Sequence, residues 1–167
     1  MAKLTFVGGI HPYDGKDLSK DKPIKVILPQ GEMVYPLSQH IGAPAVALVK
    51  KGDRVLVGQK IGEAGGFVSA PVYASVSGTV KIVEPRRVVS GDKIMSIVVE
   101  NDGLYEEVEM NGHSKPEELS KEEIINIVKE AGIVGMGGAG FPTHVKLSPK
   151  EPDKIDHVII NCAECEP

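Results

Sequence analysis

The sequence predicts a mixed fold, in which an all-β part is followed by the beginning of an α/β part. The chain of 167 residues contains 19 glycines and 12 prolines, which favours turns and short strands over a helical bundle. Short apolar runs alternate with Gly, Pro and Asp turns over 23–100, whereas residues from 120 onward carry apolar side chains at helical spacing. We therefore expect an N-terminal arm (1–22), a β domain (23–100), a linker (101–119) and the N-terminal portion of an α/β domain (120–167).

The arm is expected to be irregular, because a Gly-Gly-Ile-His-Pro stretch is followed by a charged segment. In the β domain, Gly52 and Asp53 predict a tight turn, with a left-handed glycine and a local hydrogen bond to the aspartate side chain. The Val- and Ile-rich runs that we expect to form strands are 24–28, 45–49, 54–57, 79–83 and 94–99.

Two spaced motifs indicate the type of β domain. The first is Gly-Asp-x-Val-x-x-Gly-Gln-x-Ile at 52–61, and the second runs from Ala70-Pro71 to Ser77-Gly78. Together they resemble the barrel-sandwich hybrid of biotinyl and lipoyl domains. Those domains carry a modified lysine on the hairpin between the motifs, but residues 62–68 contain no lysine. A swinging-arm carrier is therefore not expected.

A helix is predicted after the linker. Ser120 and Glu123 form a capping box, in which each side chain satisfies an amide at the helix start. Gly132 suits the position that ends the helix. The apolar stripe, which we expect to pack in the core, consists of Ile124, Ile127, Val128 and Ala131.

A glycine-rich loop follows this helix, with five glycines at 132–140. Glycines let backbone amides converge on a ligand, and Pro142 is suited to the first turn of a following helix. Lys146 adds a cation, so the loop is a candidate anion site for a phosphate group. It is not a Walker A loop, because Lys146 comes six residues after the last glycine and not directly at the helix start. It is not a dinucleotide fingerprint either, because that motif follows a strand and this loop follows a helix. A purely structural tight crossover remains the alternative.

The C-terminal segment offers a second candidate site. Residues 157–160 predict a buried strand, and Asn-Cys-Ala-Glu-Cys-Glu-Pro at 161–167 would lie at its carboxyl end, where ligands bind in open α/β sheets. Cys162 and Cys165 have the spacing of half a zinc site or a redox dithiol, but no further ligands match, so we favour small residues in a crowded loop and expect no metal. Because a domain seldom stops there, we expect a longer protein.

Four stretches in family order carry a further resemblance: 8–12, 36–44, 135–147 and 161–167, together with the barrel motifs. On these stretches the chain resembles RnfC, the peripheral subunit of the Rnf membrane electron-transport complex. The last two stretches are also similar to the flavin-bearing subunit of respiratory complex I. The resemblance implies a barrel-sandwich hybrid followed by a Rossmann-like domain that binds FMN and NADH.

The resemblance also implies site residues. Those expected at the flavin are Gly135, Gly137, Gly138, Lys146 and Asn161, with Ala163 and Cys165 contributing backbone contacts. Phe141 and Glu166 are expected on the nicotinamide side. This chain departs from the related motifs at Met136, where complex I has arginine, at Ala163, where it has an acidic residue, and at Tyr73, where RnfC is expected to have histidine.

The implied function is that of a ferredoxin:NAD oxidoreductase subunit. Hydride would pass between NADH and FMN, and single electrons between FMN and 4Fe-4S clusters, which are expected beyond residue 167. The expected partners are ferredoxin, NADH and other subunits of an ion-translocating complex, at the cytoplasmic side of the membrane. A non-catalytic docking or scaffold role for the barrel is the alternative. Nucleic acid is not expected, because the net charge is −4 and aromatic residues make up only 4%.

Overall fold

The computed structural model describes residue 13 and residues 15–110, 112, 115–136 and 140–160. The chain divides into two units. The larger one, Leu28–Lys154, holds every strand and both α-helices of the described residues. The other consists of Met1–Ile27 and Ile155–Pro167. Its described part contains one short 3-10 helix, η1 (Lys16–Leu18).

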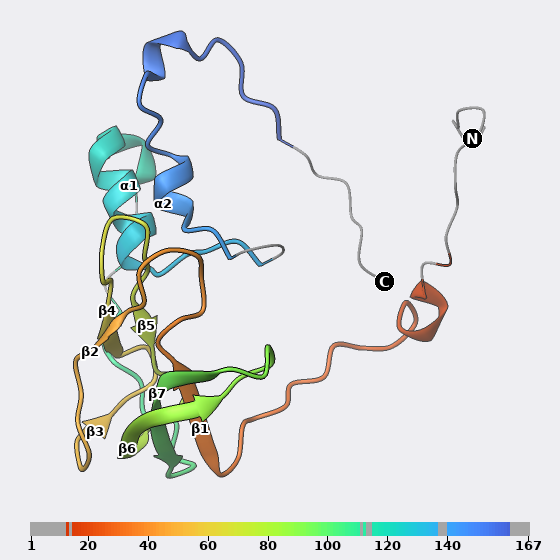
Figure 1. Cartoon of the computed structure of the whole chain (residues 1–167). Helices are drawn as coiled ribbons and strands as arrows, with labels where there is room; N and C mark the ends of the chain where they lie inside the picture. The colour runs from red at the N-terminus through yellow and green to blue at the C-terminus, as the bar shows by residue number, and fades with distance from the viewer. Residues whose placement is uncertain (1–12, 14, 111, 113–114, 137–139, 161–167) are drawn as a thin grey trace. The chain divides into compact units, whose positions relative to one another are not determined.

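Two antiparallel sheets form the β part (Figure 1). The four-stranded sheet has the order β1-β7-β6-β3, with bounds Glu32–Pro36, Lys93–Asn101, Gly78–Arg87 and Arg54–Val55. The three-stranded sheet has the order β2-β4-β5, with bounds Val46–Ala47, Lys60–Glu63 and Val72–Tyr73. Strands β6 and β7 form one long hairpin, and β1 pairs with part of its outer edge. This architecture agrees with the predicted barrel-sandwich hybrid.

The core is built from side chains of both sheets. Its fully buried aliphatic members, all at most 1% exposed, are Val55, Ile61, Val76, Val80, Ile97 and Val99. All are β-branched residues, which suit a pleated and buried surface. Burying side chains of this size is worth about 1.5–3 kcal/mol each before the cost of ordering the chain. The short strands β2, β3 and β5 are therefore held by the core as well as by their hydrogen bonds.

The predicted turn at Gly52 is confirmed. Gly52 has φ +94°, and the amide of Lys50 donates to Asp53 Oδ2 at 2.9 Å. The strands expected at 45–49, 54–57, 79–83 and 94–99 are present as β2, β3, β6 and β7, with shorter or longer bounds.

Two predicted strands are wrong. Residues 24–28 and 157–160 form no strand, and both segments are exposed; Ile24, for example, is 99% exposed. Apolar composition does not make a strand without a neighbour, because its amides and carbonyls need ladder partners. The strand that does pair with the outer edge of β7 is β1, which was not among the strands predicted from the sequence.

The predicted helix is present as α1 (Lys121–Glu130), with a capping box between Ser120 and Glu123. It ends as predicted at Gly132, which has φ +67°. The amide of Gly132 donates to Lys129 O, and the amide of Ile133 donates to Val128 O, which is the Schellman pattern.

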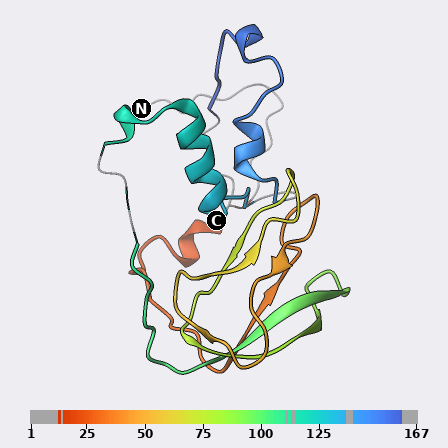
Figure 2. The same cartoon turned by 90° about the vertical axis from the view of Figure 1, so that its left-hand side faces the viewer.

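The prediction that the apolar stripe of α1 is buried in the core is wrong for the described residues. None of the helix residues is buried, Ile124 is 41% exposed, and Ala131 is exposed too. The face is half-covered because α1 packs mainly against α2 (Thr143–Lys146), which is only one turn long. Figure 2 shows the two helices side by side at one end of the sandwich.

Residues 102–110 follow the surface of the barrel. Val57 and Glu107 form a parallel bridge, and Arg54 pairs with both Asp102 and Glu106. The part of the chain that the structure describes has two further 3-10 helices, η2 (Pro116–Glu118) before α1 and η3 (Pro152–Lys154) after α2. Among the described residues, no helix has the length and apolar character needed to cross a bilayer.

Candidate functional site

The glycine-rich loop is closed at its base. Val134 and Pro142 form an antiparallel bridge, and the amide of Gly135 donates to Phe141 O at 2.9 Å. These bonds fix the two ends of the loop together. They also use the Gly135 amide, so that group is not available to an anion.

Helix α2 follows the loop directly. Pro142 is buried and has φ −60°, which suits the entry to a helix. The amide of Thr143 donates to Ile133 O at 3.0 Å, which extends the paired base of the loop into the helix. The predicted helix start after Pro142 is confirmed.

Lys146 brings a positive charge to the loop. A Cβ placed on Gly135 would lie 3.4 Å from Lys146 Nζ. The ammonium therefore lies close to the loop backbone at Gly135, at a distance that an added Cβ would meet in van der Waals contact. Among the residues that the structure describes, Lys146 has no ion-pair partner. An unpaired ammonium against a glycine-rich backbone is a suitable partner for an anionic group.

Three of the nine predicted site residues lie together. Gly135, Phe141 and Lys146 are neighbours at the base of the loop. The other six, Gly137, Gly138, Asn161, Ala163, Cys165 and Glu166, lie outside the described residues. The same holds for the cysteine pair; within the described part of the chain, no cluster of His, Cys, Asp and Glu is suited to a metal ion.

Two glycines bring the loop against the barrel. A Cβ on Gly132 would lie 2.9 Å from Pro71 O, and one on Gly140 would lie 2.9 Å from Gln39 O. Both residues have positive φ, so glycine is required for conformation and for space. The ring of Tyr73 also lies against Gly132.

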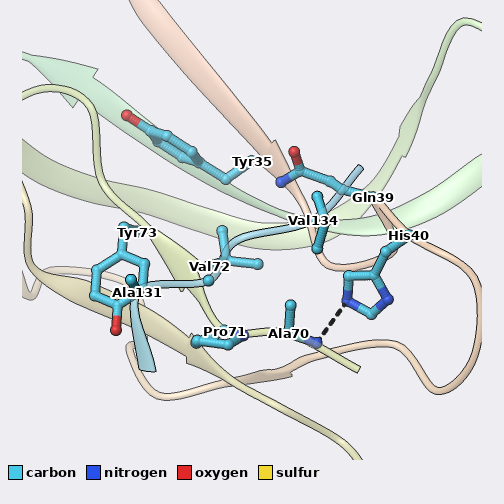
Figure 3. A pocket seen from close by; sticks show the side chains of 10 residues that line it. Tyr35, Gln39, His40, Ala70, Pro71, Val72, Tyr73, Ala131 and Val134 are labelled. Carbon is cyan, nitrogen blue, oxygen red and sulfur yellow. Dashed lines mark hydrogen bonds between the residues drawn. The ribbon is translucent and has the colours of Figure 1, made fainter. Parts of the chain in front are cut away.

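A pocket of about 390 Å³ lies where these segments meet. Figure 3 shows its lining residues, which come from the barrel and from the end of α1: Tyr35, Gln39, His40, Ala70, Pro71, Val72, Tyr73, Ala131, Gly132 and Val134. His40 Nε2 accepts from the amide of Ala70 at 3.1 Å, so Nδ1 carries the proton and donates to Ile41 O. Tyr35 Oη bonds to Ser75. The main polar groups of the pocket wall are thus engaged within the protein.

An ionic contact holds α1 to the barrel next to this pocket. Lys60 in β4 pairs with Glu130 and, at 3.3 Å, with Glu63. The hydrogen bond to Glu130 raises the pKa of Lys60 above its ordinary value. Burial raises the pKa of Tyr73, whose hydroxyl donates to Glu130 O. Tyr73 is therefore a neutral hydrogen-bond donor at physiological pH.

Only part of this arrangement is evident from the sequence. Tyr73 stands out as a departure from an expected histidine, but its contact with α1 has no local signal. His144 lies within the motif at 135–147, where no role was predicted for it. The signal for His144 was its place between Pro142 and Lys146 on a predicted helix; its partner, Phe67, is 77 residues away and carries no local signal.

Comparison with known proteins agrees with the two-part architecture. Residues 4–104 match the RnfC barrel sandwich hybrid domain family, which covers more than half of the chain. The chain belongs to the RnfC family. Residues 128–167 match the Nuo51 FMN-binding domain family. The RnfC match covers the barrel, and the Nuo51 match covers the glycine-rich loop and α2.

Curated RnfC relatives match nearly the whole chain. It is 48% identical over 164 residues to the C subunit of the Na(+)-translocating ferredoxin:NAD(+) oxidoreductase complex of Acetobacterium woodii, covering 98% of this chain and 37% of that protein. The identity is 46% to the proton-translocating counterpart of Clostridium ljungdahlii, with 98% and 36% covered. It is 41% to the C subunit of the ion-translocating oxidoreductase complex of Vibrio cholerae, with 97% and 21% covered. The chain thus spans between about a fifth and just over a third of these relatives.

Proposed function

We propose that this chain is part of the RnfC subunit of an ion-translocating ferredoxin:NAD oxidoreductase complex, and that its glycine-rich loop holds the phosphate end of FMN. The observation that carries the proposal is the ammonium of Lys146, which lies against Gly135 and has no ion-pair partner among the described residues. The match of residues 128–167 to an FMN-binding domain and the named functions of the relatives support it.

The residues present suit the phosphate group of a flavin. The ammonium of Lys146 lies beside Gly135, and α2 holds Lys146 directly beyond the loop. Gly137, Gly138, Asn161, Ala163 and Cys165 are proposed as further flavin contacts, and Phe141 and Glu166 as contacts of the nicotinamide side. Bound flavin would exchange hydride with nicotinamide and single electrons with iron–sulfur clusters. The protein's own part in this is to bind and orient the cofactor.

The remaining parts of the proposal concern the complete protein. Its redox partners are ferredoxin and NADH, and its 4Fe-4S clusters lie outside this chain. It acts at the cytoplasmic side of the membrane as a peripheral subunit, in contact with the other subunits of the complex. The complexes of the relatives are named ion-translocating, which supports a coupled role.

The proposal is tested by changing the charge at Lys146 in the complete subunit. Titration with FMN and with riboflavin, followed by flavin fluorescence, separates phosphate binding from ring binding. We expect Lys146→Gln to lower the affinity for FMN at least about tenfold, which is the range of a charge-assisted hydrogen bond. The affinity for riboflavin is expected to stay nearly unchanged. The matched control is Lys150→Gln, an exposed lysine four residues further on. Unchanged FMN affinity in Lys146→Gln would show that the loop is not the phosphate site.

The alternative function is a non-catalytic docking or scaffold barrel. It would be favoured if the complete subunit with Lys146→Gln kept its flavin while changes on the barrel surface released it from the complex. Affinity purification of the complex from cells, with subunit and flavin content measured together, distinguishes the two functions.

A further inference from the structure

His144 is the most deeply buried ionisable side chain among the described residues. It is 2% exposed, although it lies on a helix of only one turn. Its Nε2 lies 2.9 Å from Phe67 O, a carbonyl that can only accept, so Nε2 carries a proton and donates. The Phe67 ring meets the imidazole edge-on, with centroids 5.8 Å apart. The contact joins α2 to the barrel hairpin that follows β4.

The hairpin offers a fixed acceptor. The amide of Gly65 donates to the buried Ser69 Oγ at 2.9 Å, and the amide of Ala43 donates to Val68 O at 2.9 Å. Two residues further along, the amide of Ala70 donates to His40, the bond drawn in Figure 3. The Phe67 carbonyl therefore belongs to a loop that is braced by an internal hydrogen bond and by two bonds to the segment that contains His40 and Ala43.

The geometry of α2 links His144 to Lys146. Successive residues of an α-helix are rotated by about 100°, so residues two apart lie on nearly opposite faces. When His144 faces the barrel hairpin, Lys146 faces away from it, and its Nζ lies next to Gly135. A helix of one turn has little stability of its own, so its orientation depends on such contacts.

We infer that His144 is a positioning residue of the phosphate site: its hydrogen bond to Phe67 O sets the rotation of α2 and holds Lys146 against the glycine-rich loop. The barrel-sandwich domain thereby orients the proposed cofactor loop directly. This inference rests on the proposed function of that loop. In biotinyl and lipoyl domains the corresponding hairpin displays a modified lysine. In this chain the hairpin instead holds α2 in place.

The test uses the complete subunit and the ratio of its affinities for FMN and riboflavin. A residue that acts through Lys146 affects only the phosphate, whereas general damage to the domain weakens both flavins. We expect His144→Asn to lower the FMN preference about fivefold, because its shorter amide does not reach Phe67 O. His144→Gln places a donor near the position of Nε2 and is expected to keep the preference within about twofold.

A double-mutant cycle adds a second measurement. If His144 acts through Lys146, then His144→Asn has little further effect on the FMN preference in a Lys146→Gln background. Thermal melting identifies any variant that is globally destabilised, and His144→Gln remains informative if His144→Asn does not fold.

The outcomes separate the inference from the function on which it rests. An unchanged preference in His144→Asn, with a lowered one in Lys146→Gln, overturns the inference alone. Equal weakening of both flavins by His144→Asn also overturns it, in favour of a packing role. An unchanged preference in Lys146→Gln overturns the proposed function and the inference together.

Discussion

The hydroxyl of Tyr73, in β5, donates a hydrogen bond to the main-chain carbonyl of Glu130, in the last turn of α1. The carboxylate of the same glutamate pairs with Lys60 in β4. Both groups of Glu130 are therefore held by neighbouring strands of one sheet. Because a helix end leaves its last carbonyls without intrahelical partners, this contact satisfies a group that would otherwise need water. It also fixes the point from which the glycine-rich loop begins.

Replacing Tyr73 by phenylalanine removes this hydrogen bond and keeps the ring against Gly132. We expect the free energy of unfolding to fall by about 1 kcal/mol, as for a single neutral hydrogen bond. Urea denaturation followed by circular dichroism measures the loss. Tyr13→Phe, at an exposed position, is the matched control and is expected to change nothing. Equal stability of Tyr73→Phe and the unchanged chain would mean that the contact does not join α1 to the barrel.

Asp102 makes the stability of the barrel depend on pH in the acidic range. Its carboxylate accepts from Ser77 Oγ at 2.7 Å and from the Leu104 amide at 2.9 Å, and it pairs with Arg54. The hydrogen bond from Ser77 and, to a smaller extent, the other contacts lower the pKa of Asp102 below its ordinary value of about 4. The stabilisation is therefore present above about pH 4 and is lost as the pH falls through the lower, folded-state value.

We expect Asp102→Asn to be less stable than the unchanged chain at pH 7 and to lose less stability between about pH 5 and pH 2. Urea midpoints measured across this range test the expectation. Asp156→Asn, at an exposed position, serves as the control. Parallel acid profiles for Asp102→Asn and the unchanged chain would contradict the assignment.

Gly78 tests the packing of the long hairpin. A Cβ at this buried position would lie 2.0 Å from Glu100 O on the paired strand, so the backbones of β6 and β7 would have to separate. We expect Gly78→Ala to destabilise the chain by about 3 kcal/mol. The control is Gly112→Ala, where an added Cβ meets nothing within 4 Å. Urea denaturation compares the two, and similar midpoints would show that the hairpin tolerates the side chain.

Gly135 tests the close approach of the ammonium to the loop backbone. An added methyl group would lie 3.4 Å from Lys146 Nζ, which is the flexible end of a side chain and can move aside. We therefore expect Gly135→Ala to change stability by less than about 1 kcal/mol but to weaken FMN several-fold in the complete subunit. Gly66→Ala, which meets only Ala43 Cβ at 3.5 Å, is the control. If both variants bind FMN alike, the gap at Gly135 does not serve Lys146.

The features that sequence alone determined are those with local causes. The capping box at Ser120, the Schellman end at Gly132 and the turn at Gly52 each depend on residues only a few positions apart. The glycine-rich loop was evident from the spacing of its glycines, whereas the type of barrel was indicated only by the resemblance of its two motifs to biotinyl and lipoyl domains. The helix cap, the helix end and the turn need no such comparison. For these elements the deciding interactions lie within one turn or one hairpin, so the chain order contains the information.

The tertiary structure decided whatever depends on a distant partner. Residues 24–28 and 157–160 have the composition of strands, but they make no ladder, whereas β1 does because β7 lies beside it. The seating of α2 depends on His144 and Phe67, and the anchoring of α1 on Tyr73 and Glu130. A hydrogen bond between residues far apart in sequence forms only after packing has brought them together, so no local sequence pattern predicts it.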